Sequence, residues 1–255
     1  MEKLEKIECD ESFKPIIYRE ELNINLSTIK IKNYYELKYK LIAESLKKTV
    51  MKNYNYFVAK KASIEEVKRV FKLEKEKYNI LIWNYYIEPW LYHVGASILG
   101  GELALKFGWS ISISGGCYAR FPIFDDIEVS IQYLLDKKLV KKIIFLNFDK
   151  REPNFIKIIE KNNNITKKEF KNQIQTVQYL DENIASIKPD IIYYRSGSKN
   201  GKLDVQIFDI SFTYWVPICM VIAGEGSEEA ILSQFKSIET IVNYFGLLKQ
   251  KYLLN

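Results

Sequence analysis

One stretch, residues 109–151, constrains the fold more than any other part of the chain. Residues 109–114 alternate in polarity and are rich in isoleucine, which predicts a strand ended by the two glycines that follow. Residues 126–136 carry apolar side chains at helical spacing, and residues 141–148 form the short apolar run typical of a buried parallel strand. This order of strand, helix and strand predicts a βαβ unit with a right-handed crossover.

The two strands of such a unit are parallel, so both of their carboxyl ends lie at one edge of the sheet. In doubly wound sheets, ligands bind at that edge. We therefore expect any chemistry of this chain to lie in residues 115–120, which follow the first strand, and in residues 149–151, which follow the second.

The remaining sequence predicts one α/β domain spanning residues 13–255, preceded by a flexible N-terminus at residues 1–12. The further elements follow from local patterns. We expect strands at residues 191–194 and 216–223, helices at 90–107, 155–161 and 179–187, a loop with some helix at 162–174 and a loop at 195–201.

Composition narrows the function classes. The net charge of +6 comes from scattered lysines, which favours solubility over direct nucleic-acid binding. Three cysteines without a pairing pattern indicate a reducing, intracellular compartment, and no apolar run approaches the roughly 18 residues of a membrane span. The only histidine, His93, cannot supply the two or more that enzymes using histidine as base or metal ligand usually need.

Several segments, in order, resemble histone deacetylases, and the class IV branch most. These segments are PIIYREELNI, ASIEEV, SILGGELALKFGWSISISGG, DIEVSIQYLLDKKLVKKIIFLNFD, KPDIIYYRSGS, VPICMVIAGEG and IVNYFGLL. The resemblance covers most of the chain and implies the arginase/deacetylase fold, a three-layer αβα domain in which helices cover both faces of a mainly parallel sheet. It also implies a site in which zinc is held by an Asp-x-His and a second Asp, a tandem His pair acts as base and acid, and a Tyr steadies the oxyanion.

The family's functional positions fall on residues that are mostly unsuited to this chemistry. The Asp-x-His becomes Asp149 and Arg151, the second Asp becomes Lys199, the tandem His pair becomes Tyr118 and Ala119, and the Tyr falls near Gly226. Arginine and lysine have no lone pair available for zinc and repel it. The resemblance therefore implies a protein without cofactor, zinc or catalytic residues, acting as a structural or interaction subunit with protein partners.

Two alternatives stay open, namely a residual zinc-dependent deacetylase and a ligand-binding protein in which Arg120, Arg151 and Lys199 hold an acidic small molecule. For the vestigial site, we expect Asp149 to pair with Arg151 or Lys199, because a buried lone carboxylate is costly. Glu225 is the expected counter-charge for the second cation.

Other patterns favour structural roles. The aromatic stretch at residues 78–92 suits either a partner surface or internal packing, and we favour packing. His93 and Cys117 have nothing that brings them together as a nucleophile pair. The two aspartates at 125 and 126 are typical of an acidic helix start rather than of a metal site.

Overall fold

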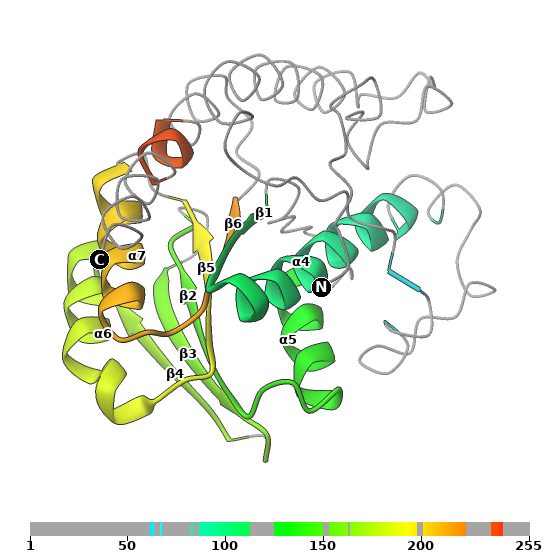
Figure 1. Ribbon diagram of the computed structural model, residues 1–255, viewed down its shortest axis with the longest axis horizontal. Helices are drawn as coiled ribbons and strands as arrows, with labels where there is room; N and C mark the ends of the chain where they lie inside the picture. Colours follow the sequence, from blue (N-terminus) through cyan, green and yellow to red (C-terminus); the bar gives the residue numbers. More distant parts are fainter. Residues whose placement is uncertain are drawn as a thin grey trace, which may run out of the picture.

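The computed structural model describes residues 62–63, 67, 83, 87–112, 125–149, 153–162, 164–197, 201–222 and 236–241, and the account below concerns these. They form a six-stranded sheet in the order β1-β6-β5-β2-β3-β4 (Figure 1). The strands are β1 Trp109–Ser112, β2 Lys142–Asn147, β3 Asn154–Glu160, β4 Ile165–Phe170, β5 Ile191–Ser196 and β6 Ile218–Ile222. The helices are α4 Glu88–Phe107, α5 Asp126–Asp136, α6 Gln173–Ile187 and α7 Gly201–Thr213.

The sheet is mixed. Strands β1, β6, β5 and β2 are parallel neighbours, whereas β3 pairs antiparallel with β2 and β4 pairs antiparallel with β3. The prediction of an α/β fold is confirmed, and so is the common direction of β1 and β2. The carboxyl ends of the four parallel strands therefore lie at one edge of the sheet, called here the carboxyl edge, and their starts form the opposite, amino edge.

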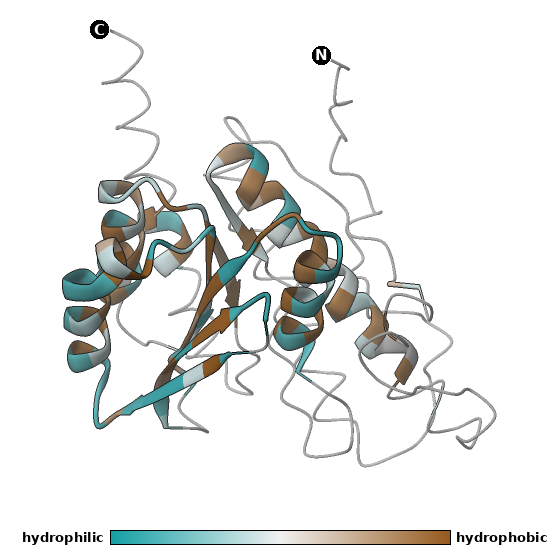
Figure 2. Ribbon diagram, turned by 90° about the horizontal axis from the view of Figure 1, so that it is seen from below, coloured by the Kyte–Doolittle hydropathy of each residue, from teal (hydrophilic) through white to brown (hydrophobic). Residues whose placement is uncertain are grey.

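Helices cover both faces of the sheet, as expected for three layers. One face of β2 and β5 packs with Leu134 and other apolar residues of α5 and with Ala104 of α4. The other face packs with Leu180 of α6 and Phe208 of α7. Hydrophobic residues gather on the central strands, and hydrophilic ones on the outer sides of the helices and on β4 (Figure 2). This burial on both faces explains why β2 and β5 read as continuous apolar runs.

Two predictions for the middle of the chain are wrong. The expected helix at 155–161 is strand β3. The segment 162–174, expected to be a loop with some helix, contains strand β4, and its last two residues begin α6. In NFIKIIE the apolar spacing suits a helix, but three of the seven residues are β-branched isoleucines, and β2 offers a partner for each residue from Phe155 to Glu160. The predicted loop at 195–201 begins too early, because Arg195 and Ser196 belong to β5.

Close packing of α4 on the sheet depends on two glycines. A Cβ added at Gly101 would lie 2.0 Å from the Tyr193 hydroxyl oxygen, and one at Gly100 would lie 2.9 Å from the Cys219 sulfur. Gly108 ends the helix in the left-handed conformation, with φ of 87°. Gly100 and Gly101 thus let α4 lie close against the sheet, and the helix predicted at residues 90–107 ends where the sequence places its end.

The aromatic stretch at 78–92 is described only in part. Its described tryptophans, Trp83 and Trp90, are buried, and they pack in a cluster with Ile87 and Leu91. For these residues, internal packing is confirmed. His93 is also buried, and no helix among the described segments combines the length and apolarity that crossing a membrane requires.

Candidate functional site

The ends of β2 and β5 meet closely at the carboxyl edge. The backbone N–H of Phe148 donates to the Arg195 carbonyl at 3.1 Å, and a Cβ added at Gly197 would lie 2.0 Å from the Phe148 carbonyl oxygen. Only glycine fits at that position without displacing the backbone of β2. The contact holds Asp149, which follows β2, next to the end of the strand that carries Arg195.

Arg195 is the one fully buried arginine among the described residues, with 0% exposure. Because side chains alternate along a strand, it lies on the same face of β5 as Tyr193, under α5. Its guanidinium forms an ion pair with the carboxylate of Asp125 and lies 5.2 Å from the centre of the Phe145 ring. Asp125 is also the N-cap of α5, since its side chain accepts from the Ile127 backbone N–H at 2.9 Å.

Three carboxylates surround this cation. Burial by itself lowers the pKa of Arg195, but the charges of Asp125, Asp126 and Asp149 outweigh it and raise the pKa above its usual value. Asp126 and Asp149 are themselves fully buried. Charge holds the guanidinium more than hydrogen bonding does, because in the described structure its Nε and Nη1 atoms have no hydrogen-bond partner. Arg195 thus stays a fixed positive charge at any pH at which the fold survives.

A buried polar network joins this cluster to the α4 side of the sheet. Ser97 of α4 donates to Asp126 at 2.5 Å, and the Tyr193 hydroxyl lies 2.5 Å from the Ser130 hydroxyl and donates to the Ser97 carbonyl at 3.3 Å. Burial raises the pKa of Tyr193 well above its usual value, so the phenol stays neutral. The network fixes the start of α5, and with it both aspartates, over the end of β5.

A further carboxylate, that of Asp204, lies on the other face of β5. Asp204, in the first turn of α7, accepts hydrogen bonds from the hydroxyls of Tyr194 and Ser196. Burial raises the pKa of Asp204, and hydrogen bonds from Ser237, Tyr194 and Ser196 counteract part of that rise. The described part of the carboxyl edge is therefore lined by buried acidic groups that the chain's own donors hold in place.

Several residues predicted from sequence lie outside the described residues: Tyr118, Ala119, Arg120, Arg151, Lys199, Glu225, Gly226 and Cys117. The pairing of Asp149 with Arg151 or Lys199 thus stays a prediction. Asp149 itself is where the sequence places it, buried at the end of β2. Asp125 is confirmed as part of a helix start, although it also binds Arg195.

Arg195 was not predicted as a site residue. Its signal was available, since IIYYRS continues an apolar strand pattern through an arginine, and arginine is almost never fully buried unless it is paired. A buried arginine at the carboxyl edge requires carboxylates, and the chain places Asp125, Asp126 and Asp149 at segment ends that reach that edge.

The arrangement does not fit the zinc that the deacetylase resemblance implies. No three His, Cys, Asp or Glu side chains among the described residues are grouped as metal ligands. A buried guanidinium next to the Asp125 carboxylate would repel a dication. Cys219, the cysteine that the structure describes, is buried on this side of the sheet, and burial raises the pKa of its thiol to about 12, which disfavours the reactive thiolate at neutral pH.

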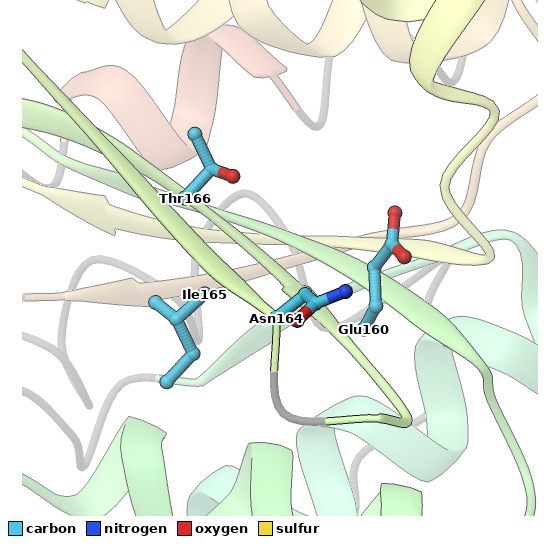
Figure 3. A pocket seen from close by; sticks show the side chains of 4 residues that line it. All are labelled: Glu160, Asn164, Ile165 and Thr166. Carbon is cyan, nitrogen blue, oxygen red and sulfur yellow. The ribbon is translucent and has the colours of Figure 1, made fainter.

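An open hollow at the β3–β4 turn is the other feature of interest. Glu160, Asn164, Ile165 and Thr166 line it (Figure 3). It lies at the amino edge, because Glu160 pairs with Lys142 at the start of β2. Its single ionisable lining group, Glu160, forms an ion pair with Lys142 at 2.8 Å, so the hollow offers no reactive pair of side chains.

The comparisons with known proteins do not assign a family. No model of a known protein family matches this chain, and no curated protein matches it in sequence.

Proposed function

We propose that this chain is a catalytically inactive histone-deacetylase-like protein that acts as a structural or interaction subunit of a larger assembly. The observation that carries the proposal is the buried Arg195, ion-paired with Asp125 and close enough to Asp149 for the two charges to interact. In the resemblance, the carboxylate at position 149 is a metal ligand. Here a side chain of the protein itself supplies positive charge beside that carboxylate.

The chemistry of the remaining residues supports the same proposal. Hydrolysis of an amide by this mechanism needs a metal to lower the pKa of water and a base to accept its proton. The positions that would carry the metal ligands and the base are Arg151, Lys199, Tyr118 and Ala119. None of these side chains is a usual zinc ligand, and none is a histidine base. The arginase/deacetylase topology of the whole sheet is part of this proposal.

The test of inactivity combines metal analysis with an activity assay. The purified full chain is incubated with excess Zn²⁺, dialysed and analysed for bound metal, and then assayed for acetate release from an acetyl-lysine peptide. We expect less than about 0.1 zinc per chain and no acetate above the no-enzyme rate, since a structural or catalytic zinc site binds stoichiometrically. Stoichiometric zinc together with acetate release would refute the proposal.

The subunit role has its own test. The chain has a mass of 30.1 kDa. In a gel-filtered extract of the native source, an antibody against the chain should detect it in fractions well above that mass. Elution as a free monomer would refute the subunit role and leave the question of activity untouched.

A further inference from the structure

The amino edge of the sheet has a different character from the carboxyl edge. Loops from the four helices lead into β1, β6, β5 and β2 there, and hydrogen bonds hold neighbouring loops side by side (Figure 1). These bonds run from the N–H of Ile218 to the Gly108 carbonyl, from Ile192 to Pro217 and from Asp190 to Lys142, at 3.1, 2.8 and 2.8 Å. With strands about 4.8 Å apart, the four loops form one surface roughly 15 Å long.

Exposed lysines cover this surface and the neighbouring β3–β4 turn, in which the Lys161 N–H donates to the Lys141 carbonyl at 2.8 Å. We call the four loops, the helix ends that lead into them and this turn the basic edge. Its exposed lysines are Lys106, Lys137, Lys138, Lys141, Lys161 and Lys188. Counting the partly buried Lys142, seven lysines stand against three carboxylates, those of Asp136, Glu160 and Asp190, which leaves four positive charges. Four of the seven lysines come from residues 137–142, and the fold brings the other three to the same edge of the sheet.

Apolar side chains stand among these lysines. Trp215 is 86% exposed, Leu139 is 50% exposed and Phe107 is 46% exposed. Phe107 ends α4, and Leu139 and Trp215 lie in the loops before β2 and β6. Large apolar side chains gathered on one rim, among charges of one sign, are the composition of a binding surface rather than of a surface kept only for solubility.

The backbone gives a second, independent sign that these side chains are used. Each loop contains one residue in the left-handed region: Gly108, Lys138, Lys188 and Trp215. Among the described residues, these last three are the only non-glycine residues with positive φ, at 58°, 49° and 56°. Glycine is the preferred residue at such positions. At three of the four, the chain instead keeps a strained backbone that carries a lysine or a tryptophan outward.

We propose that the basic edge binds an acidic segment of a partner protein that also carries apolar side chains. The proposal rests on the interaction role proposed above and names its surface and the chemistry of its partner. Acidic side chains of the segment would pair with the exposed lysines. Its apolar side chains would contact Trp215 and Leu139, and both kinds of contact are required for specific binding at an exposed site.

The three carboxylates favour a protein over a continuous polyanion. Asp190 accepts from the backbone N–H groups of Lys141 and Lys142 at 2.6 and 2.9 Å, so it is fixed within the edge. Glu160 and Asp136 are held by Lys142 and Gln132. A membrane or nucleic-acid surface would bring anions against them, whereas a protein segment can place its acids between them. A second copy of this chain would oppose lysine with lysine.

The test uses a fluorescein-labelled peptide in which Asp and Glu alternate with Leu and Phe, titrated with the full chain and followed by anisotropy. A matched peptide carries Asn and Gln in place of Asp and Glu. The edge variant is K138E/K188E. The control variant, K168E/K171E, has the same charge change on β4 and just after it, where both side chains are also exposed.

We expect the acidic peptide to bind the unmodified chain. The edge variant and the Asn/Gln peptide should each lower affinity by about tenfold or more, while the control variant stays within about twofold. Equal losses in the edge and control variants would overturn the proposal, as would equal binding of both peptides. Because Trp215 is exposed, W215G should also weaken binding without unfolding the chain, and an unchanged affinity would exclude its role.

Two further probes decide the class of partner. Phosphatidylserine-containing vesicles and a single-stranded RNA are tested with the same variants. The vesicles or the RNA would overturn the assignment to a protein segment if they bound the chain more tightly than the acidic peptide does and lost that binding in K138E/K188E. If the edge fails every test while the native chain still elutes in a large assembly, the surface is wrong and the subunit role stands.

Discussion

Replacing Arg195 by methionine tests whether the buried guanidinium holds the carboxyl edge together. Methionine keeps most of the volume and the contact with Phe145, so packing changes little. The change removes the cation that, among the described residues, interacts with Asp125, Asp126 and Asp149. Three carboxylates then repel one another, and two of them are fully buried.

The size of the effect follows from burial. Removing one partner of a buried ion pair costs about 3–5 kcal/mol, because the other charge is left uncompensated. For a chain of 255 residues, this corresponds to a fall in melting temperature of about 6–20 °C. The matched control is K142M, which breaks the Lys142–Glu160 pair. The side chains of that pair are 32% and 40% exposed, so solvent screening limits the loss to at most about 1 kcal/mol.

The assay is urea unfolding of both variants at several pH values. Without the guanidinium, the ionised carboxylates repel one another, and protonation removes that repulsion as the pH falls. R195M should therefore recover part of its loss in acid. If R195M proves too unstable to purify, D125N replaces the partly buried partner of the ion pair instead. Its loss in the free energy of unfolding should be smaller. A loss in R195M equal to that in K142M, or one independent of pH, would refute the reasoning.

Three other predictions concern the packing and charges around the sheet. G101A should destabilise the fold by about 1–3 kcal/mol in urea unfolding, because its methyl group would overlap the Tyr193 hydroxyl, and K106A on the same helix should not. W215G should leave the free energy of unfolding unchanged or raise it by up to about 1 kcal/mol, because glycine relieves the positive φ, and a fall of more than that would show a packing role. The pKa of Asp204 is raised, so protonation of its carboxyl stabilises the folded state. This contribution to the free energy of unfolding is fully present below the unfolded pKa of about 3.9 and is lost as the pH rises through the folded pKa. The stability of D204N relative to the parent chain should therefore grow as the pH rises over that range, and a difference that does not change with pH would contradict the assignment.

Local sequence patterns predicted the elements whose secondary structure is specified within their own segment. The bounds expected for α5 agree with the structure, since its apolar spacing and acidic N-cap lie within one segment. Strand β3 was missed because its identity depends on pairing with β2, which no local window contains. Helix α7 was missed as well. It is only moderately amphipathic, and the Gly- and Ser-rich sequence before it is typical of a loop.

The same distinction applies to the site. The position of Asp149 follows from the strand before it, and sequence alone places it at the carboxyl edge. The role of Arg195 depends on three segments that meet only in the folded chain: β5, the start of α5 and the residue after β2. The basic edge depends on four loops brought together by strand order. Only part of each cluster is visible in the sequence, as the adjacent Asp125 and Asp126 and as the four lysines of residues 137–142.

The two edges of the sheet should act independently, and that separates the two proposals. Strand β2 has six residues between them, from Lys142 to Asn147, which corresponds to about 20 Å. This exceeds twice the screening length of roughly 8 Å in physiological salt, so charges at one edge barely influence those at the other. Changes at Arg195 should therefore alter stability without altering binding at the basic edge, and changes at Lys138 and Lys188 should do the reverse. Their combination should be additive within about 0.5 kcal/mol, because distant sites that share no partner do not couple. A larger coupling would mean that the carboxyl edge positions the basic edge, and that the buried cation serves partner binding directly.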